Sequence, residues 1–188
     1  MHKEIEEMNE RHEWNILATA KPGYGRQLLD LLRPFGQFRW TRFWDVAIGY
    51  VPEPMSLLEE FRRQEETQPD KLEPISKLLP IDRVFDFSVE TFEERLKDAL
   101  LPYADRIDDG SFLIRIERRG HAGEIHSHNV EQHVGQALID YLAANGHHAT
   151  VDFEDPDYLL FAETLDDQCG IGMIDRRTRL RYPFLRIH

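Results

Sequence analysis

Four histidines close together in the sequence are the first side chains of this chain that could do chemistry. The cluster comprises His121, His126, His128 and His133, with Glu124 and Glu131 among them. Imidazole nitrogens and carboxylate oxygens are good zinc ligands. Their spacing, however, matches neither the His-Glu-x-x-His helix of metalloproteases nor a Cys/His finger. Two hypotheses follow: a metal-dependent hydrolase that uses His121–His133, or a loop of exposed histidines that contacts phosphate or solvent.

Two further groups offer weaker chemistry. Cys169 is the only cysteine, and a catalytic thiolate needs a base and an electropositive pocket. Because Asp166 and Asp167 precede it, we interpret Cys169 as a small residue entering a strand. Carboxylates around Pro156 could bind a hard cation, but a solvated turn is the default for such a segment. We therefore predict no catalytic residue, no metal and no cofactor. The carboxylates in question are Asp152, Glu154, Asp155 and Asp157.

Two groups of arginines favour RNA binding instead. Arginine makes bidentate contacts with phosphate and stacks on bases. Tyr182, next to the second group, and His121, next to the first, could stack on an exposed base. The alternative is a set of surface salt bridges with the many acidic residues. The first group is Arg115, Arg118 and Arg119, and the second is Arg176, Arg177, Arg179 and Arg181.

The net charge of −12 and the pI of about 5.2 argue against simple nucleic-acid binding. A local basic patch can still bind phosphate on an acidic protein, although long-range steering should then be weak. The acidic balance also leaves open an interaction module for a basic protein. The single cysteine fits a reducing compartment, and no apolar run is long enough for a membrane span. We expect a cytoplasmic protein that makes no membrane contact, and we leave its oligomeric state open.

The elements of the first half predict a ferredoxin-like domain over residues 13–88. Residues 1–12 read as a frayed tail or a short helix turn. Strands and helices then alternate as strand, helix, strand, strand, helix, strand, which is the split βαβ order. Residues 68–80 contain three prolines and are expected to be irregular. The expected strands cover residues 14–20, 38–44, 46–51 and 81–87, and the expected helices lie between Gly25 and Pro34 and over residues 54–64.

An aromatic run in this half has two interpretations. We favour the core of a small domain, which is where such residues most often lie. The alternative is a base-stacking face, because Arg39 and Arg42 flank the aromatic residues and Arg26 in the preceding turn could contact an RNA backbone. The run consists of Phe38, Trp40, Phe43 and Trp44.

The second half, residues 89–188, predicts a mixed α/β domain. Ser88 is a candidate cap for a helix that ends by Pro102. Asn145-Gly146 is a plausible end for the main helix. The expected strands cover residues 112–117, 149–153, 158–165 and 170–174, and the main helix covers residues 128–145.

The order of motifs in this half resembles the THUMP domain, and within that superfamily the stand-alone adaptors for tRNA N4-acetylcytidine formation. The resemblance rests on Arg115 to His121, Ser127, Val134-Gly135, Val151-Asp152, Pro156-Asp157 and Cys169 to Gly172. It implies an α/β fold that binds the acceptor stem and 3′ end of tRNA. It also implies a non-catalytic role, in which a separate tRNA-modifying enzyme acts on the bound tRNA. On this view the two arginine groups, His121, Ser127 and Tyr182 form the RNA-binding site.

Overall fold

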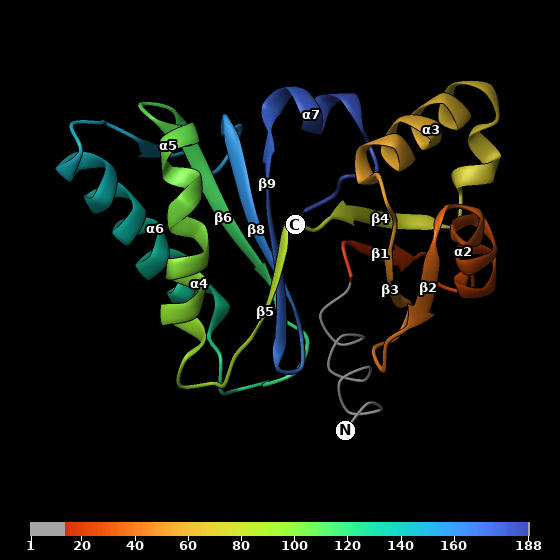
Figure 1. Cartoon of the computed structure of the whole chain (residues 1–188), viewed down its shortest axis with the longest axis horizontal. Helices are drawn as coiled ribbons and strands as arrows, with labels where there is room; N and C mark the ends of the chain where they lie inside the picture. Colours follow the sequence, from red (N-terminus) through yellow and green to blue (C-terminus); the bar gives the residue numbers. More distant parts are fainter. Residues whose placement is uncertain (1–13, 188) are drawn as a thin grey trace. The chain divides into compact units, whose positions relative to one another are not determined.

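The computed structural model describes residues 14–187, which form two compact units (Figure 1). Unit 1 comprises residues 14–84 and 181–187, and unit 2 comprises residues 85–180. This division differs from the predicted ranges 13–88 and 89–188 chiefly because the last seven described residues belong to unit 1. The tail or helix turn predicted over residues 1–12 lies outside the described residues. No helix within residues 14–187 is long and apolar enough to cross a membrane.

Unit 1 is an antiparallel sheet in the order β2-β3-β1-β4, with two helices between its strands. The order of elements is the predicted one, strand, helix, strand, strand, helix, strand. Two 3-10 turns, η1 (Arg33–Phe35) and η2 (Pro69–Leu72), follow the helices. The elements are β1 (Ile16–Ala20), α2 (Gly25–Leu32), β2 (Gln37–Trp40), β3 (Val46–Tyr50), α3 (Pro54–Thr67) and β4 (Ile75–Pro80).

The fourth strand of unit 1 corrects two predictions. Residues 68–80 are not irregular throughout, because β4 pairs with β1 and buries Ile75, Leu78 and Leu79. The prolines frame this strand instead of breaking it: Pro74 precedes it and Pro80 is its last residue. The strand expected at 81–87, shortened to β5 (Arg83–Asp86), belongs to the second sheet.

The C-terminal segment completes the core of unit 1. The backbone N–H of Leu78 in β4 donates to the carbonyl of Phe184 at 3.0 Å. The Phe184 ring packs edge-on against Phe61 of α3, with the ring centroids 6.3 Å apart. Tyr182, Phe184 and Leu185 are all buried. The chain therefore leaves unit 1 after Val84 and returns to it at Arg181.

Unit 2 is a mixed sheet in the order β5-β9-β8-β6-β7. β6 runs parallel to β7 and β8, whereas β8 and β9 form an antiparallel hairpin. This mixed α/β architecture confirms the predicted fold class. The elements after β5 are α4 (Phe92–Leu100), η3 (Leu101–Tyr103), α5 (Ala104–Ile107), β6 (Ser111–Glu117), α6 (Ser127–Ala144), β7 (Thr150–Val151), β8 (Tyr158–Leu165), β9 (Gln168–Asp175) and α7 (Arg176–Arg181).

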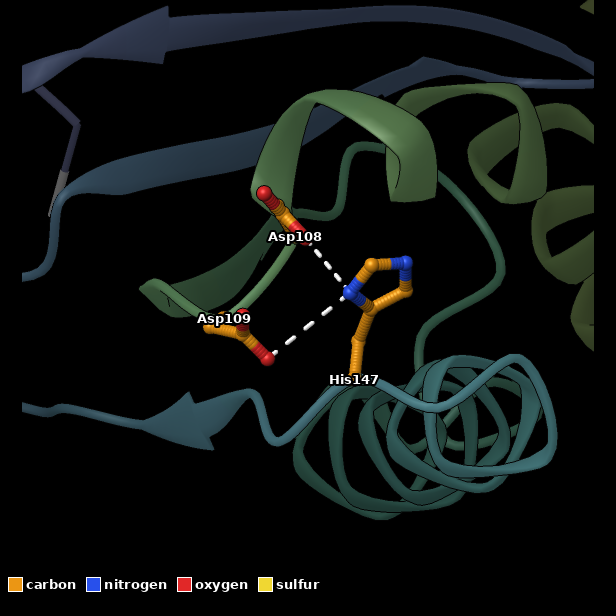
Figure 2. A group of neighbouring side chains, drawn as sticks. All are labelled: Asp108, Asp109 and His147. Carbon is orange, nitrogen blue, oxygen red and sulfur yellow. Dashed lines mark ion pairs between the residues drawn. The ribbon is translucent and has the colours of Figure 1, made fainter.

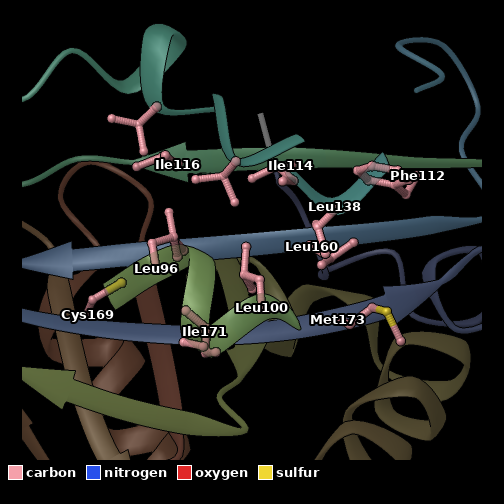
Figure 3. Close-up of a cluster of buried hydrophobic side chains, with 14 of the residues drawn as sticks. Leu96, Leu100, Phe112, Ile114, Ile116, Leu138, Leu160, Cys169, Ile171 and Met173 are labelled. Carbon is pink, nitrogen blue, oxygen red and sulfur yellow. The ribbon is translucent and has the colours of Figure 1, made fainter. Parts of the chain in front are cut away.

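The core of unit 2 lies between the sheet and its helices α4 and α6 (Figure 3). Alternate residues of β6 supply one layer: Phe112, Ile114 and Ile116. This alternation is the period-2 pattern of a strand with one face on a helix layer. Cys169 lies in the same core and is fully buried, which confirms its interpretation as a small residue entering a strand. Burial raises the pKa of its thiol well above the ordinary value.

Ser88 does not cap α4 as predicted. The helix begins four residues later, at Phe92. The N–H of Ser88 instead donates to Thr91 Oγ1 at 2.9 Å, and the N–H of Thr91 donates back to the Ser88 carbonyl at 3.0 Å. The two residues close a turn that leads the chain from β5 into the helix.

Candidate RNA-binding surface

The four clustered histidines do not converge on one point. His121 Nε2 lies 2.8 Å from Asp167, and His133 Nδ1 lies 3.1 Å from Glu93. His126 is the residue at the N-terminal cap of α6, and His128 Nδ1 lies 3.9 Å from a Glu131 oxygen. Within residues 14–187, no three metal-ligating side chains of this cluster come together. The four histidines therefore do not form one common metal site within the described residues.

A different group within residues 14–187 does bring three such side chains together. Asp108, Asp109 and His147 have ligand atoms within 4.8 Å of one another (Figure 2). His147 Nδ1 lies 2.5 Å from Asp108 Oδ1, and Asp109 Oδ1 accepts the backbone N–H of His148 at 2.7 Å. These contacts connect the turn before β6 to the loop after α6. We interpret the group as an ion pair between two loops.

Arg119 is committed to a buried ion pair. Its Nη1 lies 2.5 Å from Glu163 Oε2, and the two side chains are 13% and 1% exposed. The backbone N–H of Arg119 donates to Thr164 Oγ1 at 2.9 Å, and the backbone N–H of Asp166 donates to the Arg119 carbonyl at 3.1 Å. Arg119 thus connects the end of β6 to the β8–β9 hairpin. Because its guanidinium is bound to Glu163 and mostly buried, it is poorly placed to contact a phosphate.

The two residues after Arg119 hold the chain close to the same hairpin. Gly120 has a φ of +93°, and a Cβ there would lie 3.1 Å from the Asp166 Cα atom. Glycine tolerates both the positive φ and the close approach to Asp166, because it has no Cβ. The carboxylates of Asp167 first, and then Glu124, accept hydrogen bonds from the His121 ring and raise the pKa of His121 above its ordinary value. Arg118, which donates to the Gly120 carbonyl at 2.5 Å, is half-buried.

The second arginine group lies in the helix α7. Arg176 and Arg179 both pair with Asp155, at 3.1 and 2.9 Å, and Arg176 also pairs with Asp157 at 2.9 Å. Arg179 first, and then Arg176, hold the pKa of the Asp155 carboxyl below its usual range. The acidic turn is therefore the partner of these arginines. Arg177, by contrast, is exposed.

Arg181 and Tyr182 lie in unit 1. Arg181 Nη2 lies 3.1 Å from Glu59, and the Tyr182 hydroxyl donates to the same carboxylate at 3.0 Å. Hydrogen bonds from Arg62 first, and also from Tyr182 and Arg181, lower the pKa of Glu59 to about 2. Tyr182 is only 5% exposed, so its predicted base-stacking role does not fit its position. For Arg181, the contact with Glu59 fits the salt-bridge interpretation better than the RNA-binding one.

Arg115 lies at a pocket that the sequence did not reveal. β7 pairs only with Ser111 and Phe112. From Leu113 onward, the edge of β6 that faces away from β8 therefore has no strand beside it within the described residues. α6 and the segment after β7 wall this edge into a mostly apolar pocket of about 210 Å³. We call it the β6-edge pocket. Its polar or exposed lining residues are Arg115, His128, Glu131, Gln132, Gln136 and Phe153.

The chemistry of the β6-edge pocket suits a flat, polar-edged ligand. Glu131 Oε1 accepts the N–H of Ile116 at 2.8 Å, and Glu131 Oε2 lies 3.7 Å from Arg115, so the carboxylate is fixed between strand and guanidinium. Phe153 is 67% exposed at the rim. Apolar walls with a few fixed polar groups are typical of small-molecule and base sites. Ser127, the first residue of α6, lies one residue before His128 of this pocket.

The aromatic run of unit 1 is not a core, which corrects the favoured interpretation. Trp44 is 93% exposed and Trp40 is 38% exposed, and Phe38 and Phe43 are only partly buried. β2 is the edge strand of its sheet, and the residues after it form an exposed loop. The other interpretation, an open aromatic face flanked by arginines, is the one that the geometry permits.

Residues 87–173 match the family model of the THUMP domain. This segment, which makes up most of unit 2, is therefore a THUMP domain. No curated protein sequence matches the chain significantly.

Solved structures share the fold of both units. PH1313 from Pyrococcus horikoshii Ot3 is 14% identical with a TM-score of 0.59, and TrmN from Thermus thermophilus is 19% identical with a TM-score of 0.59. A 4-thiouridine synthetase, solved as an RNA complex with bound ATP, is 11% identical with a TM-score of 0.52. Each alignment covers 86% of this chain but only 55%, 45% and 41% of the respective structure. The chain thus spans about half the length of these proteins or less.

Proposed function

We propose that this chain is a tRNA-binding adaptor without an active site of its own. It recognises the acceptor stem and 3′ end of tRNA and presents the tRNA to a separate modifying enzyme. Its motifs resemble those of the adaptors for tRNA N4-acetylcytidine formation, and this resemblance indicates an RNA cytidine acetyltransferase as that enzyme. The observation that carries the proposal is the THUMP domain at residues 87–173. The fold shared with a 4-thiouridine synthetase that was solved with RNA supports it.

The β6-edge pocket supplies the RNA contact of unit 2 in this proposal. Sequence-specific RNA recognition uses unstacked bases, which stack on aromatic rings and hydrogen-bond along their edges. Phe153 offers the exposed ring, and the amides of Gln132 and Gln136 offer donors and acceptors for a base edge. Arg115, at 29% side-chain exposure, is near enough to the surface to contact a phosphate. Arg118 and exposed Arg177 remain further phosphate contacts in the proposal.

The non-catalytic part of the proposal is supported by the positions of the side chains that could have been catalytic, Cys169 and the clustered histidines. Cys169 is buried and its raised pKa disfavours the thiolate. The clustered histidines are each held by a different carboxylate or at a helix start. A purified chain that binds tRNA yet modifies none of its nucleotides fits this part of the proposal. Modified nucleotides in tRNA incubated with the chain alone and the common cosubstrates would contradict it.

The test of the RNA contact compares matched variants in a tRNA-binding titration. Arg115→Ala should weaken binding and reduce the salt dependence by about one phosphate contact. Phe153→Ala should cost roughly the 1–3 kcal/mol that stacking of a base contributes. Arg95→Ala removes an exposed arginine of α4 from the same unit and should leave binding unchanged. If Arg115→Ala and Phe153→Ala both bind tRNA as the parent does, the pocket is not the RNA site.

A further inference from the structure

Three metal-ligating side chains of unit 2 have no part in the proposed function. Asp108 and Asp109 lie in the turn before β6, and His147 lies in the loop after α6. Figure 2 shows the three side chains pointing toward one another. We call them the Asp-Asp-His group. The two segments are also joined by the main chain, because the backbone N–H of Thr150 donates to the Gly110 carbonyl at 3.2 Å. The fold therefore fixes the segments that carry the group next to each other.

The spacing of the ligand atoms suits one small cation. Zn²⁺ binds imidazole nitrogen and carboxylate oxygen at about 2.0–2.2 Å, so ligand atoms around a tetrahedral ion lie about 3.3 Å apart. His147 Nδ1 lies 2.5 Å from Asp108 Oδ1 and 3.7 Å from Asp109 Oδ1. These two distances bracket the spacing that the ion requires. The side chains of Asp108, Asp109 and His147 are 60%, 65% and 40% exposed, so small side-chain rotations suffice to equalise the distances.

The negative charge of the group has no lysine or arginine beside it. Within residues 14–187, His147 is the only ion-pair partner of Asp108 and Asp109. The carboxylate of Asp155, in another loop of unit 2, is instead paired with two arginines of α7. Two carboxylates that share one imidazole keep a net negative charge even when the imidazole is protonated. A divalent cation between them offsets that charge.

We propose that the Asp-Asp-His group binds one Zn²⁺ ion. The imidazole disfavours Mg²⁺ and Ca²⁺, which take oxygen ligands, and the lack of a thiolate among the three ligands disfavours Cu(I) and iron–sulfur clusters. Zn²⁺ binds such ligands more tightly than Mn²⁺ or Fe²⁺ and imposes no geometry of its own. His147 ligates the ion through Nδ1, as the neutral tautomer that carries its proton on Nε2. The ion and the ion pair of His147 with Asp108 are thus alternatives for the same atoms.

The ion links the two segments at the point where β6 and β7 begin. Ser111 is the first residue of β6, Thr150 is the first residue of β7, and the two residues pair. β7 is only two residues long, so few backbone contacts hold this end of the sheet. Because the ligands come from distant parts of the chain, the site exists only in the folded state, and the ion stabilises unit 2 by its binding. The role of the site is therefore structural.

The test titrates the full chain, stripped of metal with EDTA, with Zn²⁺ in competition with a chromophoric chelator. The parent should bind one ion at this site. His147→Ala and Asp108→Asn should each weaken that binding at least tenfold, because loss of even an outer-shell partner costs about 10–100-fold. Asparagine tolerates the φ of 53° at position 108. His133→Ala is the matched control, because His133 has a single carboxylate beside it, that of Glu93, and should leave zinc binding unchanged.

Thermal unfolding followed by circular dichroism provides a second readout. Saturating Zn²⁺ should raise the midpoint by at least about 5 °C in the parent and in His133→Ala, and by much less in His147→Ala and Asp108→Asn. The inference is wrong if the parent binds no stoichiometric Zn²⁺, or if both ligand variants bind it as tightly as the parent. Binding that weakens equally in His133→Ala would also overturn it. None of these results depends on tRNA, so the inference and the proposed function can fail independently.

Discussion

The buried pair of Arg119 and Glu163 makes the sharpest prediction about stability. Arg119→Ala leaves a carboxylate that is 1% exposed without its cation at 2.5 Å. Removal of one partner from a buried ion pair costs about 3–5 kcal/mol, because the remaining charge stays uncompensated. For a unit of this size, 1 kcal/mol corresponds to a shift of about 4–8 °C in Tm. Unit 2 should therefore melt at least about 12 °C lower in this variant.

Glu163→Gln is a milder change to the same ion pair. It keeps the shape of the side chain, and the remaining Arg119 is 13% exposed with Glu117 at 3.8 Å as a second partner. We therefore expect a smaller loss, about 1–3 kcal/mol for the unmade charge-assisted bond. The double variant should lose less than the sum of the two single losses, because the two side chains contact each other and their contributions to stability are therefore coupled.

Unfolding of the two units can be followed with different signals, because the tryptophans all lie in one part of the chain. All three tryptophans of the sequence fall within residues 1–84, so tryptophan fluorescence follows unit 1. Far-UV circular dichroism also follows unit 2, which contains the long helix α6. Urea unfolding of Arg119→Ala should show its loss by circular dichroism. Arg95→Ala should shift stability by no more than about 0.5 kcal/mol. A loss for Arg119→Ala as small as that of Arg95→Ala would contradict a buried ion pair, because Arg119 would then behave as a surface arginine.

Two further predictions concern single contacts. Tyr182→Phe removes the hydroxyl that donates to Glu59 at 3.0 Å and should cost about 0.5–1.5 kcal/mol; unfolding followed by tryptophan fluorescence measures it, and no loss would show that the ring packing alone matters. The raised pKa of His121, due to Asp167 and then Glu124, stabilises the fold below the unfolded pKa of about 6.5, and this contribution is lost as pH rises through the folded pKa. His121→Gln should remove that part of the pH dependence; an unchanged stability profile would contradict the pairing.

Periodicity and spacing predicted most of unit 2. The helix α6 and the strand β8 appear almost where the apolar pattern placed them, because each packs one face on a shared core. The strand β4 was missed because Pro69, Pro74 and Pro80 suggested an irregular segment. Proline at the ends of a strand is compatible with pairing, and only the register with β1 shows that the residues between pair.

The candidate site was predicted less well, because its partners are distant in sequence. Arg181 and Glu59 are 122 residues apart, and Arg119 and Glu163 are 44 apart. Composition could indicate that salt bridges were available, but not which arginines would make them. Phe153 drew no attention in the sequence, since its value lies in the open edge of β6 beside it. The exposure of Trp44 likewise depends on β2 being an edge strand.

Binding of labelled tRNA, with and without its 3′-terminal CCA, across a salt series is the most direct test of tRNA recognition by this chain. We expect the chain to bind intact tRNA with an affinity that falls as salt rises. Removal of CCA should weaken binding, because the unpaired end loses its stacking contacts. Equal binding of both tRNAs would contradict recognition of the 3′ end. Absence of binding even at low salt would contradict the RNA-binding role and favour a protein partner for the acidic surface.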